Sequence, residues 1–473
     1  MYKYPRKQIS VTDFGMPLGM KLDPNNRWVK KAQTIPWEEV ELRYAELFKS
    51  NKGNVAKPLQ MALGAVLVQT EYQYSDVEVT LQIQETPCLQ YFCGMPGYTD
   101  ELPFDPSLMV HFRKRLTPEI LGEINEMIIA KAAAKAPVDQ SEDNNDDSEP
   151  PNDGTLIVDS TCAPQDIRYP QDTSLLNEAR ENLEGMIDDM HDPAQGEKPR
   201  TYRRKAKQDY LKIAKKRNKT SKEIRKAIKK QLQYIRRDVH IVDTMQESGK
   251  ELTDRQSERF ETIKVLYAQQ FFMHQNRTHK VDDRIVSLAQ PWVRPIIRGK
   301  AKAKCEFGAK IDISVSDGFV RLEHTSFDAY NESENLQEII ERYRTRTGHY
   351  PQRVLADQIY RNRDNLKYCK ERGIQLSGKP LGRPRKDYVP DKKLNRADEI
   401  DRIEVERKFS HAKGSFGLGL IRTRLAQTSK TAIALSIIAL NIAYIERILR
   451  TLFQLLCVRV QSLFVPQYFA FIQ

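Results

Sequence analysis

The sequence predicts an α/β core that is interrupted by a long helical insertion and preceded by an all-α N-terminal domain. Two short apolar segments each end in an aspartate, Asp159 and Asp357, as buried strands with a polar C-terminal end do. Between them, helical periodicity gives way to strict alternation of apolar and polar residues. A charged amphipathic helix is expected over 396–417.

Composition indicates a globular protein with one strongly basic segment. The chain of 473 residues is 40% hydrophobic and 30% charged, which argues against a wholly disordered protein, and its net charge is +12. Lys198–Arg237 holds 18 Lys and Arg but only two acids, Asp209 and Glu223, so the rest of the chain is slightly acidic. This asymmetry favours a polyanionic partner, nucleic acid before an anionic membrane.

Cysteine usage and hydropathy favour a reduced, cytoplasmic protein. The six cysteines form no CxxC pair and no Cys/His box at zinc spacing, and His274 and His279 are expected at the surface. The N-terminus has no apolar signal core. The longest uncharged apolar run, Thr431–Ile445, is short for a membrane span, so a buried helix is expected there.

Residues 1–136 are expected to form a helical domain. Helices are predicted over 38–49, 58–72, 77–89, 107–116 and from Pro118 to Ala136. Several of these helices end in basic residues, so the domain could bind DNA, and plain helical packing is the alternative. Residues 137–153 hold seven acids and three prolines, which predicts a flexible linker, with an acidic mimic of DNA as the minor alternative.

The core is expected to begin at 154–170, where Thr155–Thr161 forms a buried strand. Asp159 then either caps a turn or lies where parallel strands present ligands. Residues 171–297 are predicted to be a helical insertion that contains the basic block 198–237. The block is either a solvated helical surface or a phosphate-contacting one; its candidate DNA-binding residues are Arg203, Arg204, Lys205, Lys215, Lys216 and Arg217.

The core resumes over 298–430. A hairpin is predicted across the Asp317-Gly318 turn, followed by a helix over 331–346, a strand ending in Asp357, a helix over 362–372 and a short strand over 374–377. The basic loop 379–385, which contains Arg383 and Arg385, either enters a minor groove or is a linker. Residues 431–473 are an apolar helical tail that either packs on the core or mediates self-association.

The last helix of the core carries a third acid. At about 100° per residue, Arg402, Glu406 and Lys413 fall within a sector of roughly 40°. Val405, Phe409 and Ala412 form the adjacent apolar stripe, and Glu404, Arg407 and Lys408 are expected to point mostly the other way. Taken alone, this pattern equally describes an ordinary amphipathic helix with solvated charges.

Without the insertion, the predicted order is β-β-β-α-β-α-β-α, which is the order of the ribonuclease-H-like fold. In that fold three carboxylates converge at one edge of the sheet. Carboxylates without His or Cys suit Mg²⁺ and suit zinc poorly. Two such ions about 4 Å apart can activate a nucleophile and stabilise a leaving oxygen in phosphodiester chemistry.

Several segments resemble the DDE transposases of bacterial insertion sequences, in the insertion sequence five superfamily that is related to insertion sequence four. The matching segments are TLIVDSTCAPQDIRYPQDTSLLNEAR, QPWVRPIIRGKAKAKCEFGAK, VLADQIYRNRDN and RIEVERKFSHAKGSFGLGLIRTRL, with PLQMALGAVLVQ and SLMVHFRKRL in the N-terminal domain. The resemblance implies that Asp159, Asp357 and Glu406 are catalytic and bind metal. Arg402 and Lys413 match the signature spacing, but Glu399 stands where the family has a tyrosine.

The resemblance also implies an activity and partners. The expected function is Mg²⁺-dependent DNA strand cleavage and strand transfer, with two ions and with Mn²⁺ as a substitute. The expected partners are double-stranded DNA, as terminal inverted repeats and target, and a second copy in a homodimer. No membrane, no small-molecule cofactor and a nucleoid-associated place in the bacterial cytoplasm are expected. The alternatives are a non-catalytic end-binding repressor, a nuclease on the same fold without strand transfer, and a protein that binds membrane surfaces through its basic block.

Overall fold

The computed structural model describes residues 2–3, 8–48, 52–134, 151–297, 305–382 and 391–464, with side chains to 457 in the last helix. Within it the chain divides into two compact units. The first comprises Met1–Ala163, Ile311–Thr325 and Tyr330–Gln473, and the second comprises Pro164–Lys310 and Ser326–Ala329. Most of the predicted linker, and Arg383 and Arg385, lie outside the described residues.

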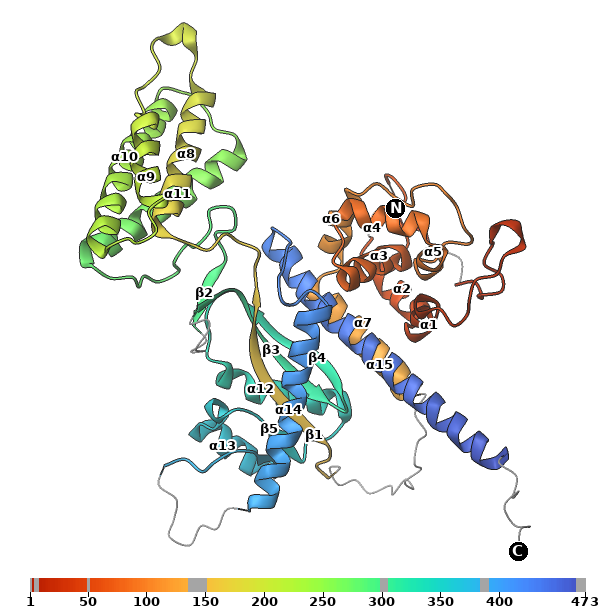
Figure 1. The fold of residues 1–473 in the computed structure, drawn as a ribbon. Helices are drawn as coiled ribbons and strands as arrows, with labels where there is room; N and C mark the ends of the chain where they lie inside the picture. The colour runs from red at the N-terminus through yellow and green to blue at the C-terminus, as the bar shows by residue number, and fades with distance from the viewer. Residues whose placement is uncertain are drawn as a thin grey trace, which may run out of the picture. The chain divides into compact units, whose positions relative to one another are not determined.

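The N-terminal part of the first unit is helical, as predicted (Figure 1). The helix predicted over 77–89 is in fact two helices, because Pro87 has no N–H to continue the first and instead begins the second. The helices are α1 (Arg27–Thr34), α2 (Trp37–Ala45), α3 (Leu59–Tyr72), α4 (Asp76–Glu85), α5 (Pro87–Phe92), α6 (Leu108–Arg115) and α7 (Pro118–Ala133).

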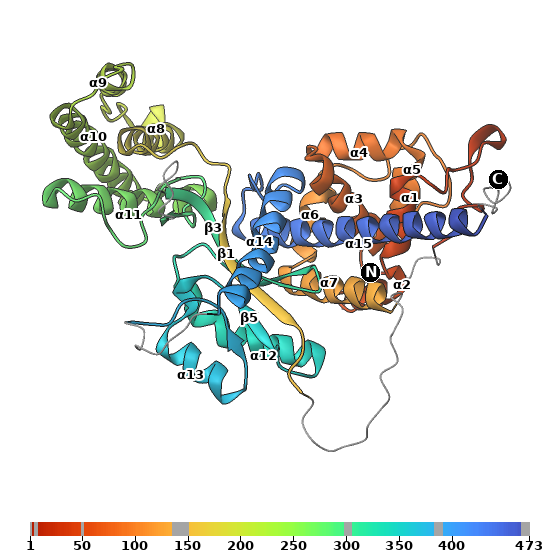
Figure 2. The same cartoon turned by 60° about the horizontal axis from the view of Figure 1, so that its bottom comes forward.

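The C-terminal helix α15 (Ala426–Phe464) packs against these N-terminal helices and runs beside α7 in both views (Figures 1 and 2). Its apolar run is buried from Ile433 to Ile442. Within this run, the buried Asn441 Nδ2 donates a hydrogen bond to Asn125 Oδ1 of α7 at 2.8 Å. Ala426–Cys457 is long and apolar enough to cross a membrane by length and composition, but 61% of its most apolar window is buried within the protein. Burial of this kind is typical of a core helix.

A six-stranded sheet forms the centre of the α/β part, so the expected mixed α/β class is confirmed. The path through the sheet is β2-β3-β1-β5-β6, and β4 pairs with β3. Asp317 and Gly318 both have positive φ at the β3–β4 turn, as a tight hairpin requires. The strands are β1 (Thr155–Pro164), β2 (Arg294–Ile297), β3 (Cys305–Ser316), β4 (Phe319–Ser326), β5 (Arg353–Leu355) and β6 (Gln375–Leu376).

Strand β2, which pairs antiparallel with the start of β3, was not predicted from the sequence. The predicted insertion, 171–297, therefore includes one strand of the sheet. β2 has only four residues and contains Pro295, so it lacks the alternating pattern that signals a strand.

Three helices follow the hairpin in the predicted order: α12 (Leu336–Thr347), α13 (Arg363–Glu371) and α14 (Lys392–Ser415). Gly348 ends α12 in the left-handed conformation. The apolar side of α12 packs with β1 and β5, where Leu156, Ile340 and Val354 are fully buried or nearly so.

The second unit contains the helices α8 (Asp172–Met190), α9 (Arg203–Ala214), α10 (Ser221–Glu247) and α11 (Asp254–Asn276), which lie together (Figure 1). Capping boxes start both long helices, with Thr220 and Glu223 on α10 and Thr253 and Gln256 on α11. α8, α10 and α11 share one apolar core, which confirms that the part of the basic block on α10 is helical with an apolar inner stripe.

Asp238 of α10 is an acid buried against that core, and its burial predicts that the stability of the folded protein depends on pH. Its side chain is fully buried, and neither carboxylate oxygen has a hydrogen-bond partner among the described residues. Burial, helped by the charge of Glu184, raises its pKa from 3.8 to about 7. The unfolded chain thus ionises Asp238 at lower pH than the folded chain does, so stability falls as the pH rises from about 4 to 7.

We expect Asp238→Asn to remove much of this pH dependence, which amounts to at most about 4 kcal/mol for a shift of this size. Urea unfolding at pH 4.5 and pH 8 measures the difference. Glu247→Gln, an exposed change on the same helix, serves as the control. An unchanged pH dependence in Asp238→Asn would show that the aspartate is not the responsible group.

Candidate active site

The pairing of β1 with β5 brings Asp159, midway along β1, and Asp357, which follows β5, to the same end of the paired segment. The two strands are parallel, with Thr155 opposite Arg353 and Ile157 opposite Leu355. The same register, continued by two residues, sets Asp159 opposite Asp357. Asp159 is the half-buried fifth residue of β1, and Asp357 is the exposed residue from which a short 3-10 turn starts after β5.

The electrostatics of Asp159 show how close the two acids are. Burial, together with the negative charge of Asp357, raises the pKa of Asp159 from 3.8 to about 6. The backbone N–H of Ser160, which donates to Asp159 Oδ1 at 2.8 Å, and the cation of Arg402 act in the opposite direction. The two carboxylates thus repel each other, and the Arg402 cation offsets that repulsion only in part.

Helix α14 contacts the surroundings of these two acids through two cations that flank Glu406 along the helix. The Arg402 guanidinium forms an ion pair with Asp357 Oδ1. Lys413 Nζ donates to Thr161 Oγ1 at 3.0 Å, and Thr161 lies two residues after Asp159 on β1. Glu406 lies between the two cations on the same side of α14, with an exposed side chain. The predicted stripe of Arg402, Glu406 and Lys413 therefore faces the middle of β1 and the residue Asp357 that follows β5.

The burial of the remaining residues of α14 differs from the prediction at one position. Val405, Phe409 and Ala412 are buried as expected, but so is Lys408. Its Nζ donates to the Gly318 carbonyl of the hairpin turn and lies 3.8 Å from the centre of the Tyr444 ring on α15. Burial lowers the pKa of Lys408 to about 8. Lys408 was predicted on the solvated side because the local sequence does not indicate that α15 covers this part of α14.

Glu332 is an additional acid that the sequence pattern did not single out. It begins a 3-10 turn (Glu332–Asn335) directly before α12, and its Oε2 accepts a long hydrogen bond, 3.4 Å, from Ser160 Oγ. Its charge also contributes to the raised pKa of Asp159. Nothing in the local pattern separates Glu332 from Glu334, which is exposed two residues later, so only the fold reveals it.

The donor chemistry at this edge fits a hard divalent cation. Asp159, Asp357, Glu332 and Glu406 supply only carboxylate oxygens, and the repulsion that raises the pKa of Asp159 would be relieved by a bound cation. Among the described residues no three acidic, His or Cys side chains are already grouped closely enough to hold a metal ion. The fit therefore rests on the kind of ligand and on the shared location.

The candidate DNA-contacting residues of the basic block fall into two groups. Arg203 forms a bidentate ion pair with Asp188 at 2.6 and 2.9 Å, and Lys216 pairs with Glu223 at 2.5 Å. The side chains of Arg204, Lys205, Lys215 and Arg217 are exposed on or just beyond α9.

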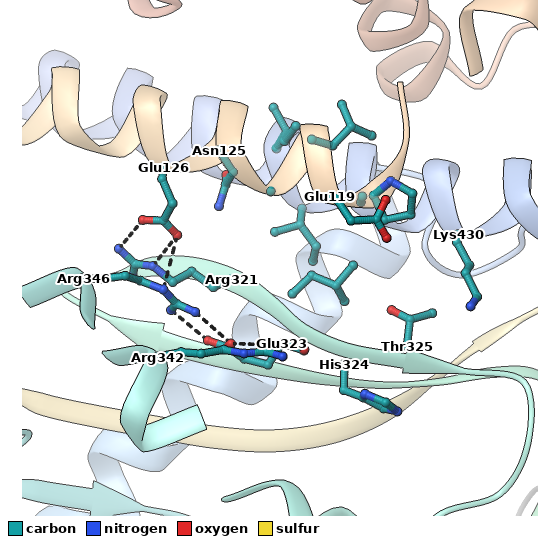
Figure 3. Close-up of a pocket in the computed structure, with 17 residues that line it drawn as sticks. Glu119, Asn125, Glu126, Arg321, Glu323, His324, Thr325, Arg342, Arg346 and Lys430 are labelled. Atoms are coloured by element: carbon teal, nitrogen blue, oxygen red, sulfur yellow. Dashed lines mark hydrogen bonds and ion pairs between the residues drawn. The ribbon is translucent and has the colours of Figure 1, made fainter. Parts of the chain in front are cut away.

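A separate polar pocket of about 390 Å³ lies where α7, β4, α12 and α15 meet (Figure 3). Arg321 of β4 pairs with Glu126 of α7 at 2.8 Å, and Arg346 of α12 forms two bonds with Glu323 of β4 at 2.8 and 2.9 Å. Each arginine thus already has a carboxylate partner, and the cluster fastens the N-terminal helices to the sheet.

Comparison with known proteins connects this geometry to transposition proteins. Residues 354–443 match the family model described as "Transposase DDE domain", and residues 17–115 match "Transposase domain (DUF772)". The chain is also 28% identical over 162 residues to "Uncharacterized protein ORF8 in nfe locus" of Rhizobium meliloti, which covers 34% of this chain and 73% of the relative. No solved structure matches. The first match includes Asp357, Glu406 and the whole of α14.

Proposed function

We propose that this chain is a DDE transposase, which binds the ends of an insertion sequence, cleaves DNA strands there and joins the freed ends to target DNA. One observation carries the proposal: the β1–β5 register, continued by two residues, sets Asp159 opposite Asp357, and α14 contacts Asp357 and Thr161 through residues that flank Glu406. An acid from each of two parallel strands and one helix is the arrangement that this chemistry requires.

The strand arrangement supports a ribonuclease-H-like core with a helical insertion after its first strand. Without β2, the sheet reads β4-β3-β1-β5-β6, so the first strand is central and the hairpin lies on one side of it. The ligand site then lies at the carboxyl end of the paired segment of β1 and β5, and parallel strands generally place their sites at that end.

Asp159, Asp357 and Glu406 would hold Mg²⁺, as two ions, with Mn²⁺ as a substitute. When bound, the metal supplies Lewis-acid stabilisation of phosphodiester oxygens, and no small-molecule cofactor is needed. Arg402 holds the Asp357 carboxylate in place, and the partial burial of Asp159 reduces the screening of its own charge by water. Lys413 lies beside β1, where it would neutralise a phosphate of the bound strand.

Two other functions remain as alternatives: an end-binding repressor without catalysis, and a nuclease that releases cut ends without joining them. The two exposed carboxylates, Asp357 and Glu406, and the cations Arg402 and Lys413 beside them favour catalysis over repression. Incubation with labelled end DNA, Mg²⁺ and a supercoiled target distinguishes the three. A transposase yields joined products, a nuclease yields only free ends, and a repressor leaves the DNA intact.

The proposed partners are double-stranded DNA, as terminal inverted repeats and target, and a second copy of the chain. The proposed location is with the nucleoid in the bacterial cytoplasm. A membrane-surface protein would instead bind anionic vesicles even in the presence of competing DNA.

The exposed cations of α9 predict salt-dependent binding to duplex DNA. We expect the combined change of Arg204, Lys205, Lys215 and Arg217 to Gln to weaken binding to all sequences alike. The slope of log affinity against log salt should become shallower by about 0.9 for each phosphate that the variant no longer neutralises. Fluorescence anisotropy at several salt concentrations measures it. Arg255→Gln, an exposed cation on α11 outside the block, is the control. An unchanged slope would mean that these cations are only solvated.

A further inference from the structure

A basic and aromatic groove of about 430 Å³ lies between α10 and α11, within the second unit. α10 contributes cations spaced four and seven residues apart, which places them along one side of the helix. α11 contributes two aromatic rings and a histidine on its facing side. The residues that matter here are Arg225, Lys229, Arg236, Tyr267, Phe271 and His274.

The groove is selective in charge. Three permanent cations line it, and no acidic side chain is among its lining residues in the described chain. Burial, followed by the nearby charges of Arg225 and Lys229, lowers the pKa of His274, so its ring stays neutral at physiological pH. A polyanion is therefore the ligand class that fits, and the phosphates of duplex DNA alone would not need the rings.

The rings add a second recognition element. Tyr267 packs on the apolar core. The Phe271 ring stacks on the Tyr267 ring, with ring centres 5.9 Å apart and planes inclined by 22°. Phe271 remains 42% exposed, so its outer side is open for another flat ring. Exposed aromatic rings beside a row of cations are the means by which proteins bind single-stranded nucleic acid, because every base can stack and every linker carries a phosphate.

We propose that this groove binds an unpaired stretch of DNA, with a base stacked on Phe271 and its phosphates on Lys229 and Arg236. This inference rests on the proposed action on DNA and assigns the α10–α11 groove a task different from that of the α9 cations. α9 contacts duplex, whereas the groove holds strands that are unpaired.

The test compares the full-length protein with variants on a single-stranded oligonucleotide and its duplex. Phe271→Ala should weaken single-strand binding roughly tenfold, which is the size expected when one base no longer stacks, and should leave duplex binding unchanged. 2-Aminopurine in the oligonucleotide should be quenched by the wild type but not by this variant. Phe271→Tyr should restore both signals, and Phe271→Leu, which keeps the packing, should not.

Phe272 provides a matched control, because it is the next residue on α11, is 51% exposed and does not line the groove. Phe272→Ala should bind single strands as the wild type does. An equal loss in both alanine variants, or a loss in Phe271→Ala that is equal for duplex and single strand, would overturn the proposal.

If end cleavage is normal while Phe271→Ala has no effect, only the groove assignment fails. If the stacking difference persists in a protein that neither cuts nor joins DNA, only the proposed transposition chemistry fails.

Discussion

Asp159→Asn should abolish Mg²⁺-dependent strand cleavage while leaving the binding of end DNA intact. The change keeps the size of the side chain and its hydrogen bond from the Ser160 N–H, but it removes a charged ligand from the carboxylate pair. Metal-ion stabilisation of a phosphoryl transition state is worth several kcal/mol, so the cleavage rate should fall by roughly 10³-fold or more. Gel assays of cleavage and anisotropy measurements of binding, on the same preparation, separate the two effects.

Glu406 and Glu404 give this prediction an internal control on one helix. Glu406→Gln should lose cleavage as Asp159→Asn does, because Glu406 lies along α14 between the two cations that contact Asp357 and Thr161. Glu404→Gln should retain it, because Glu404 pairs loosely with Lys408 on the other side of α14, at 3.8 Å. Normal cleavage by Asp159→Asn, or equal losses in both glutamate variants, would contradict the proposed site.

The sequence was most informative where local pattern and local structure agree. Short apolar segments ending in aspartate predicted the positions of β1 and β5, although β1 continues past Asp159 to Pro164. The spacing on α14 predicted that Arg402 and Lys413 share a side of the helix, and their contacts with Asp357 and Thr161 agree with that spacing. Periodicity identifies which side of an element is apolar, so such features can be read without knowing the fold.

Features that depend on distant segments could not be predicted. Lys408 was expected in solvent, but α15, which begins 18 residues later, covers it. Glu332 approaches Ser160 from 172 residues away, and β2 is a strand only because β3 pairs with it. In each case the local sequence is compatible with several environments, and only tertiary packing selects one.

The buried carboxylate of Glu323 should be the most important single charge for the stability of the first unit. Its side chain is fully buried on β4, where it receives two bonds from Arg346 and one, at 2.5 Å, from Ser314 Oγ. Burial alone would raise its pKa, but these partners outweigh burial and hold the pKa below its usual range. Glu323→Gln would leave the partly buried Arg346 with only Glu126 as a carboxylate partner, and we expect a loss of about 3 kcal/mol in the free energy of unfolding.

The pH dependence of this loss follows from the lowered pKa. The ion pair is fully formed above the unfolded pKa of a glutamate, about 4.3, and its contribution is lost as the pH falls through the lower folded value. Urea unfolding should therefore show a large difference between wild type and Glu323→Gln at neutral pH and a smaller one in acid. Glu338→Gln removes an exposed partner of Arg342 on α12 and should cost less than about 1 kcal/mol. Similar losses in the two variants would mean that surface pairing, rather than the buried contact between β4 and α12, stabilises this unit.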